Sequence, residues 1–325
     1  MFFIFLLEFF QRKNMVAPNS RDFYYNYPSY LREVFNERVQ KITIDAGFTC
    51  PNRDGTKGYG GCTYCNNEAF VPSFSQKKEA IAKQISDGIG FFAHKYNNQK
   101  YLAYFQSYSN TYGPIDFLKA IYEEALSNPQ IAGLVIGTRP DCVTDELLDY
   151  LSDLAQKTYI MVEYGVESTL NTTLQTINRG HTYEDAVEAI NKTAALGIST
   201  SAHLILGLPG ETRQDMLDHA VKISELPITT LKLHQLQIVK QTKMAKQYAE
   251  DPAQFHLFSF EEYIDILAEF IALMNPKIVL ERFVSQTPAD LLIAPHWGLK
   301  NYEFSAKLEK CLRERNIHQG DRYKK

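Results

Sequence analysis

From residue 41 onward, short apolar segments alternate with longer segments that have a helical pattern. The predicted strands cover 41–47, 100–108, 131–139, 159–166, 200–208, 230–239 and 277–284. The segments between them, such as PIDFLKAIYEEAL and YEDAVEAINKTAALG, repeat apolar residues three and four positions apart, as amphipathic helices do. Near-continuous apolar strands that alternate with helices predict an α/β fold with a parallel sheet covered by helices.

Polar residues recur where these predicted strands end. They are Cys50, Gln106, Ser107, Ser109, Arg139, Asp141, Glu163, Glu167, His203, His234, Gln237, Lys240 and Arg282. In a (β/α) barrel the carboxyl ends of the strands converge on one mouth, where the active sites of that fold lie. A doubly wound open sheet would spread the same residues along an edge, with a crevice at one point only. The distribution therefore favours a barrel or partial barrel.

The chain divides into three predicted parts. The opening MFFIFLLEFF is too short to span a bilayer and lacks the basic start of a signal peptide, so residues 1–23 are interpreted as a leader. It is either a non-native extension upstream of a start at Met15 or a weak interfacial anchor. The predicted barrel covers 24–245. Residues 246–325 begin with a connection longer than the earlier ones and form a predicted C-terminal α/β extension that covers the barrel mouth.

Charge and cysteine usage limit the class of protein. The formal net charge is -4 and the pI about 6.1, so the surface as a whole is no nucleic-acid footprint, although a local basic groove is compatible with it. Five cysteines in 325 residues are too few for a disulfide-stapled secreted protein. We therefore expect a cytoplasmic protein whose clustered cysteines bind a metal or take part in chemistry.

Three of the five cysteines lie in one glycine-rich segment, FTCPNRDGTKGYGGCTYCNN. Cys62 and Cys65 form a C-x2-C pair that can reach one metal centre from a single turn, and Cys50 lies eleven intervening residues upstream. A structural zinc site would need a fourth ligand, and no second pair of ligands is found nearby in the sequence. An iron–sulfur cluster held by three cysteines would leave one iron free for a ligand that is not protein. The position after the first strand favours the cluster.

These motifs resemble the radical S-adenosylmethionine (SAM) superfamily, in which the free iron of a [4Fe-4S] cluster binds the amino and carboxylate groups of SAM. The usual C-x3-C-x2-C motif is replaced here by C-x11-C-x2-C, which is similar to the Elongator catalytic subunit and, more closely, to the YhcC/YtqA-like family. Further similarity to that family lies in YLAYFQSYSNTY, VEYGVES, INRGHTYEDAVEAI, HLILGLPGE and LLIAPHWGLKNYEF. The resemblance implies a partial (β/α)6-type TIM barrel as the catalytic core.

The resemblance also assigns roles to individual residues. It implies that Cys50, Cys62 and Cys65 ligate the cluster and that Tyr64 lies near the SAM adenine or shields the cluster. The other residues expected to contact the cofactor are Gln106, Ser109, Arg139, Glu163, Gly165, His203, Gly207 and Lys240. For Arg139 with Asp141 a structural ion pair is an equal alternative, and His203 could instead be a core histidine. Candidates for catalysis are Asp141, Cys142 and His234.

The implied reaction is reductive cleavage of SAM to methionine and a 5'-deoxyadenosyl radical, with an electron donor of the flavodoxin or ferredoxin type. Similarity to the Elongator subunit suggests transfer RNA (tRNA) as substrate, at the side chain of a wobble uridine. A basic and aromatic rim for RNA could be formed by Arg53, Lys57, Lys240, Lys243, Trp297, Lys300 and Tyr302. The alternatives are a radical SAM enzyme acting on a small metabolite or peptide, a zinc-dependent (β/α) hydrolase, and a redox-inactive RNA- or partner-binding barrel.

Overall fold

A computed structural model describes residues 23–66, 79–93 and 99–324. The predicted leader therefore lies outside the described residues except for Phe23. No helix within the described residues is long and apolar enough to cross a membrane.

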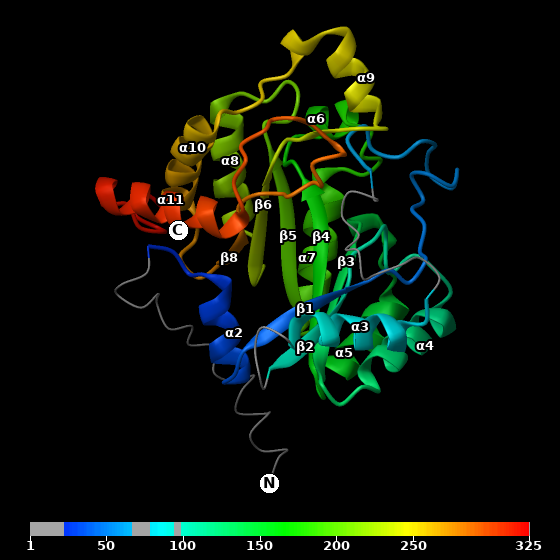
Figure 1. The fold of residues 1–325 in the computed structure, drawn as a ribbon. Coiled ribbons are helices and arrows are strands. Elements are labelled where there is room, and N and C mark those ends of the chain that lie inside the picture. Colours follow the sequence, from blue (N-terminus) through cyan, green and yellow to red (C-terminus); the bar gives the residue numbers. More distant parts are fainter. Residues whose placement is uncertain (1–22, 67–78, 94–98, 325) are drawn as a thin grey trace.

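The main sheet contains seven parallel strands in the order β1-β2-β3-β4-β5-β6-β8 (Figure 1). Their bounds are β1 Val39–Ile44, β2 Lys100–Phe105, β3 Ile131–Thr138, β4 Tyr159–Glu167, β5 Ser199–Leu206, β6 Thr230–Gln235 and β8 Val279–Arg282. Because neighbours in the sheet follow one another along the chain, the sheet curves as a partial barrel and is not doubly wound. The predicted fold class is confirmed.

Helices connect the strands. They are α2 Tyr27–Phe35, α3 Ile81–Ala93, α4 Ile115–Leu126, α5 Asp145–Ala155, α6 Asn171–Thr176, α7 Tyr183–Ala195, α8 Arg213–Ser224, α9 Lys243–Glu250, α10 Phe260–Leu273 and α11 Asn301–Arg315, with 3-10 turns η2 Pro140–Cys142 and η3 Pro252–Gln254. Thr182, Thr212 and Ser259 form capping boxes at the starts of α7, α8 and α10, so the backbone amides at the N-cap and N3 positions of each helix are satisfied by local side chains.

Strand residues alternate between two environments. Ile42, Phe105 and Val162 pack in one core with apolar residues of the covering helices. Residues at the alternate positions of the strands, such as Leu102, Val135 and Met161, face the opposite side and form a second core with tyrosines of α2 and the segment before it. Helix α2 contacts both β1 and β8, the two edge strands, and Asn26 forms a parallel bridge with Leu280. The interior of the partial barrel is therefore filled near the amino ends of the strands, which leaves space toward their carboxyl ends.

One predicted strand is divided between two sheets. Residues 230–239 were expected to form a single strand, but β6 ends at Gln235, and Ile238–Val239 form β7, which pairs antiparallel with β9 Leu292–Ala294. The chain leaves the main sheet here because a segment far along the sequence offers β7 another partner. Strand β8 lies beyond residue 245 and still joins the main sheet next to β6, and a domain boundary at 245 stays a prediction.

Candidate active site

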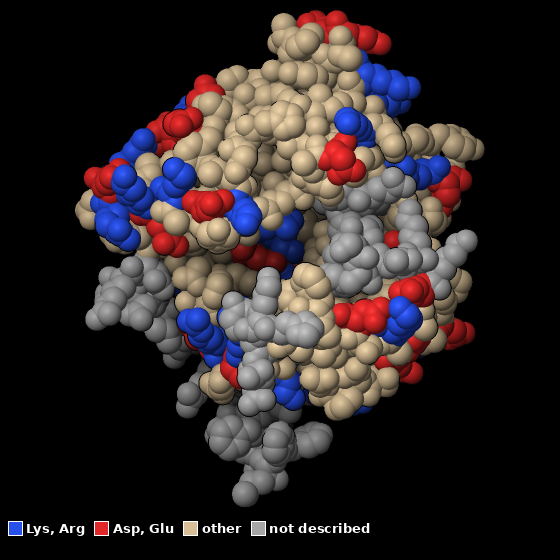
Figure 2. Space-filling model, in the orientation of Figure 1, with Lys and Arg blue, Asp and Glu red and all other residues tan. Residues whose placement is uncertain are grey.

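One pocket opens at the carboxyl ends of the strands. Figure 2 shows a hollow in the corresponding face, with both basic and acidic side chains visible at its bottom. Of the residues predicted to form the site, the pocket is lined by Cys50, Cys62, Tyr64, Cys65, Gln106, Ser109, Arg139, Glu163, Gly165, His203 and His234. These residues of the cysteine loop and of the strand ends thus lie around one pocket, and their roles in binding or catalysis stay predictions.

Four predicted residues do not line this pocket: Asp141, Cys142, Gly207 and Lys240. Cys142 is buried, and burial raises the pKa of its thiol to about 12. Gly207 has a φ of 91° and faces the ring of Phe258. Lys240 is exposed and is held by its backbone, whose N–H donates to the Leu291 carbonyl at 2.8 Å. Roles for these four in cofactor binding or catalysis stay predictions.

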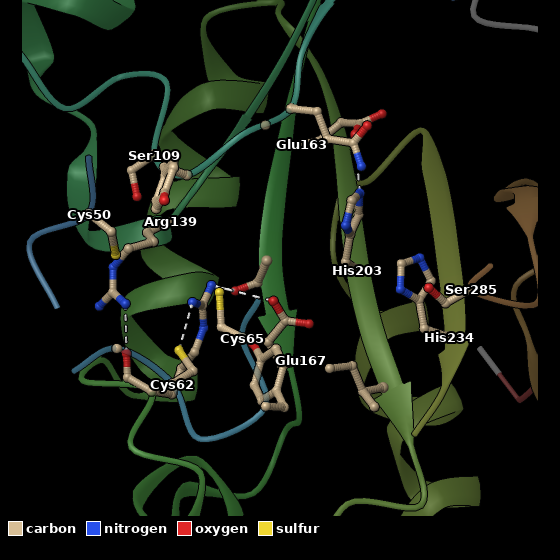
Figure 3. Close-up of a pocket in the computed structure, with 18 of the residues that line it drawn as sticks. Cys50, Cys62, Cys65, Ser109, Arg139, Glu163, Glu167, His203, His234 and Ser285 are labelled. Carbon is tan, nitrogen blue, oxygen red and sulfur yellow. Dashed lines mark hydrogen bonds and ion pairs between the residues drawn. The ribbon is translucent and has the colours of Figure 1, made fainter. Parts of the chain in front are cut away.

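The loop that carries the cysteines folds back on itself. The N–H of Gly61 donates to the Asn52 carbonyl at 2.8 Å, and the N–H of Cys65 donates to the Cys62 carbonyl at 3.1 Å, which places Cys62 and Cys65 on one tight turn. Gly61 has a φ of 75°, and a Cβ there would lie 2.7 Å from Arg53 Nε, so the turn requires glycine. Figure 3 shows the three cysteines on the same side of the pocket.

Donor groups surround the sulfur of Cys62. Arg179 Nη1 donates to Cys62 Sγ at 3.5 Å, and Asn52 Nδ2 donates to the same sulfur at 3.8 Å. Arg53 Nη2 donates to the Cys65 carbonyl at 2.7 Å. Cationic and amide donors of this kind stabilise a thiolate, the form that binds metal. Burial together with Cys62 raises the pKa of Cys65 to about 11, so metal ligation here would release a proton.

The cysteines of the loop supply donors for a metal cluster. Within the described parts of the chain, no three His, Cys, Asp or Glu side chains come close enough together to hold one metal ion. The three cysteines nevertheless line one pocket. Cysteine thiolates are the ligands of iron–sulfur clusters, so the residues present fit a [4Fe-4S] cluster.

Arg179 was missed as a site residue by sequence reasoning, although it lies in the NRGH motif quoted above. Its side chain is buried, and its Nη2 donates to the Gly165 carbonyl at 2.6 Å and lies 3.5 Å from Glu167 Oε1. A Cβ on Gly165 would lie 2.6 Å from both Arg179 Nη2 and Glu167 Oε1. Gly165 is therefore glycine because the guanidinium that reaches Cys62 lies against this backbone.

Arg139 and Asp141 form the predicted ion pair. Arg139 Nε and Nη2 donate to the two oxygens of Asp141, each at 2.9 Å, and Lys57 Nζ donates to the same carboxylate at 2.7 Å. Burial alone would raise the pKa of Asp141, but hydrogen bonds from Arg139 and Lys57 hold it well below its usual value. Arg139 Nη1 also donates to the Arg179 carbonyl at 2.8 Å, so this pair fixes the loop that carries Arg179.

A layer of charged side chains lies at the bottom of the pocket. Glu163, which is 1% exposed, accepts hydrogen bonds from Lys41 Nζ and Lys232 Nζ, each at 2.7 Å, and lies 3.1 Å from His203 Nε2. Glu281 Oε1 accepts from the same two ammonium groups at 2.7 and 3.2 Å. Glu163 is thus already paired on both oxygens, and its expected contact with the SAM ribose stays a prediction.

The two lysines respond differently to this layer. Burial lowers the pKa of Lys232 to about 8, because the loss of hydration disfavours the charged ammonium more than Glu163 and Glu281 stabilise it. Lys41 is also buried, yet Glu163 and Glu281 raise its pKa well above the usual value. The pKa of Glu163 lies well below its usual value, because the two lysines and His203 more than offset its burial.

Sequence reasoning missed Lys41, Lys232 and Glu281, although a signal for them was present. Each stands within a short strand rich in apolar residues, VQKITI, TLKLHQ or VLER, directly beside at least one buried apolar residue. A charged side chain at such a position is stable only when groups of opposite charge lie beside it.

Two family models match this chain. A family model described as the radical SAM superfamily matches residues 50–223, and a radical SAM C-terminal domain matches 228–314. The protein YtqA of Bacillus subtilis is 33% identical over 93% of each chain, and YhcC of Escherichia coli K12 is 34% identical over 88% of this chain and 91% of its own.

More distant similarity extends to a group of RNA-modifying proteins. A tRNA uridine(34) acetyltransferase of Methanocaldococcus infernus is 24% identical over 49% of this chain and 30% of its own. Among solved structures, the Elp3 protein of the same archaeon, with residues 1–46 deleted, superposes with a TM-score of 0.67 at 16% identity, covering 86% of this chain and 64% of that one. At this identity the superposition shows a common fold.

Proposed function

The chain belongs to the radical SAM superfamily, and we propose that its pocket binds SAM beside a [4Fe-4S] cluster and cleaves it reductively. Enzymes of this superfamily use both cofactors. When bound, the cluster supplies one electron, which splits SAM into methionine and a 5'-deoxyadenosyl radical that takes hydrogen from a substrate. The observation that carries the proposal is that Cys50, Cys62 and Cys65 line one pocket whose remaining walls are free of cysteine within the described residues.

The protein groups have the tasks of holding and orienting the cofactors. Arg179 and Asn52 donate toward the Cys62 sulfur, and Gly165 leaves room for that guanidinium. Tyr64, Gln106 and Ser109 line the pocket beside the cysteines and are our candidates for contacts with SAM. We propose Cys50, Cys62 and Cys65 as the three ligands of the cluster.

Anaerobic reconstitution tests the cleavage reaction. The protein should become brown, absorb near 400 nm and form 5'-deoxyadenosine when SAM and dithionite are added. A colourless protein that retains about one zinc per chain would instead support the hydrolase alternative. A brown protein that forms no 5'-deoxyadenosine would contradict the proposed reaction while leaving the cluster in place.

For the substrate we propose tRNA, at a wobble uridine. The support is the similarity to tRNA uridine(34) acetyltransferases. One of them matches this chain over 163 residues, or 49% of its length, at 24% identity. Some residues of the predicted rim suit RNA: Lys243, Lys300 and Tyr302 are exposed. Others are committed elsewhere, because Lys57 pairs with Asp141 and the ring of Trp297 stacks on Phe304.

The nucleoside composition of total tRNA tests this substrate. Mass spectrometry should find a modified uridine that is present in the parent strain, absent from a strain lacking the gene, and restored by the wild-type gene. Restoration should fail with a Cys62→Ala gene and succeed with a Cys311→Ala gene, because Cys311 lies on α11 away from the pocket. An unchanged profile would reject tRNA and favour a metabolite or peptide substrate.

Such an enzyme also needs an electron donor, and we propose a flavodoxin or ferredoxin in the cytoplasm. All five cysteines are free thiols in the structure, which suits a reducing compartment. The test replaces dithionite with a reduced flavodoxin or a reduced ferredoxin. Formation of 5'-deoxyadenosine with either protein would support this kind of partner, and no formation with both would contradict it.

A further inference from the structure

The wall of the pocket opposite the cysteines has a different character. Figure 3 shows His203, His234 and Ser285 on that side, away from the three labelled cysteines. These residues come from β5, β6 and the segment after β8, and Arg282, the last residue of β8, lines the pocket with them. This wall carries a guanidinium but no part of the cysteine loop.

Arg282 is held in place by a neutral partner. Its Nη2 lies 2.9 Å from His234 Nε2, and a guanidinium can only donate, so His234 accepts through Nε2 and carries its proton on Nδ1. Burial, followed by the charge of Arg282, holds the pKa of His234 well below its usual value, so this histidine adds no charge to the wall. The interaction orients the guanidinium and does not neutralise it.

No carboxylate of the described residues lies within ion-pair distance of Arg282. Glu281, its neighbour in the chain, points to Lys41 and Lys232, and Glu163 is occupied by the same lysines and by His203. Arg282 Nε is also buried without a hydrogen-bond partner in the described structure.

Two of the other guanidinium groups that line the pocket have a carboxylate partner: Arg139 pairs with Asp141, and Arg179 lies 3.5 Å from Glu167. The third, Arg53, donates to the Cys65 carbonyl on the cysteine side of the pocket. A half-buried cation without an anion is costly, and the fork of donors on an arginine fits the paired oxygens of a carboxylate or phosphate. The missing partner is therefore expected to arrive with a ligand.

We propose that Arg282, oriented by His234, forms a substrate subsite that binds an anionic group, either a phosphate or a carboxylate. The subsite lies across the pocket from the predicted cluster ligands, so a substrate anchored here would extend toward the cysteine side. The subsite rests on the proposed function in one respect, namely that the anchored molecule is the one from which hydrogen is taken.

Binding of two simple anions to the reconstituted protein tests the subsite. Inorganic phosphate and acetate are titrated calorimetrically at constant ionic strength, with and without saturating SAM. We expect saturable binding of at least one anion in the presence of SAM. Tighter phosphate binding would identify a nucleotide or RNA phosphate as the source, and tighter acetate binding a carboxylate substrate, and either result supports the subsite.

Variants locate the binding. Arg282→Gln should weaken the preferred anion at least tenfold, or about 1.4 kcal/mol, and Arg282→Lys should weaken it less because the charge is kept. Arg313→Gln, which alters an exposed arginine on α11, should bind like wild type. Circular dichroism verifies that each variant is folded. If Arg282→Gln does not fold, the titration of the wild type with and without SAM still decides whether the subsite exists.

Three results would overturn the subsite: no saturable anion binding by the wild type, full displacement of both anions by SAM, or equal affinity in the folded Arg282→Gln protein. Displacement by SAM would assign Arg282 to the carboxylate of the cofactor. Failure of the subsite is distinguishable from failure of the proposed function, because 5'-deoxyadenosine formation by the wild type is measured without either anion.

Discussion

Removal of the Glu163 carboxylate should destabilise the protein far more than removal of a surface carboxylate. Glu163 accepts hydrogen bonds from Lys41 and Lys232, and all three side chains lie inside the partial barrel. Glu163→Gln keeps the size of the side chain but leaves two buried ammonium groups with Glu281 as their only carboxylate partner among the described residues.

The expected cost follows from breaking a buried ion pair on one side. Such changes cost about 3–5 kcal/mol, because the remaining charge is left without compensation. At roughly 2 °C per kcal/mol for a large domain, the melting temperature should fall by about 6–10 °C. The matched control is Glu269→Gln, since Glu269 pairs with Arg213 on the exposed surface and should cost about 0.5 kcal/mol or less.

Urea and thermal unfolding of the same preparations measure both variants. A second comparison separates charge from packing: Glu163→Gln with Lys232→Met should lose less than the sum of the single variants, because the second change removes one of the uncompensated charges. Equal losses for Glu163→Gln and Glu269→Gln, or strictly additive losses in the double variant, would refute the reasoning.

Three further predictions concern residues next to this layer and next to Cys62. Arg179→Gln should make the midpoint potential of the reconstituted cluster more negative, because a cationic donor to Cys62 is lost. A tenfold lower equilibrium constant for reduction corresponds to a shift of about 60 mV. An unshifted potential in an EPR-monitored titration would contradict the role of this contact. Gly165→Ala should lower iron content and cost about 1–3 kcal/mol in unfolding free energy, because the new Cβ would lie 2.6 Å from Arg179 Nη2 and Glu167 Oε1; normal iron content would show that the loop can yield. Burial lowers the pKa of Lys232 to about 8, so the folded chain binds fewer protons at this site than the unfolded chain between pH 8 and about 10.4. The wild type should therefore gain stability relative to Lys232→Met as pH rises through that window, and urea midpoints that run parallel would refute the shift.

The fold could be predicted because its determinants are local. The strand from 159 to 166 was expected and β4 covers Tyr159–Glu167, since an apolar run between two amphipathic helices has few other ways to bury itself. The end of β6 could not be predicted, because β7 leaves the sheet to pair with β9, more than 50 residues later.

The site was only partly predictable for a similar reason. Cys62 and Cys65 could be recognised from their spacing, but Arg179 reaches Cys62 only because α6 and its loop fold back over the pocket. Likewise, nothing local relates Lys41 to Glu281, which lie 240 positions apart and meet across the interior of the partial barrel. Pairing between distant charges depends on the tertiary fold, and the sequence of each strand shows only a charged residue among apolar ones.

Recognition of the superfamily came from motifs and was confirmed by the family models and relatives. The spacing C-x11-C-x2-C carried this inference, because three thiolates with one vacant position suit a cluster that binds SAM. The substrate stays a proposal, since it depends on contacts such as those of Arg282 that no motif specifies.

The central claim is that Cys50, Cys62 and Cys65 together hold the cluster that cleaves SAM. The most direct measurement is the iron and sulfide content, with 5'-deoxyadenosine formation, of the three single Cys→Ala variants beside Cys311→Ala after anaerobic reconstitution. We predict about four irons and active SAM cleavage in the wild type and Cys311→Ala, and loss of cleavage with depleted iron in each of the other three. Full iron content and wild-type cleavage in Cys62→Ala would contradict the account.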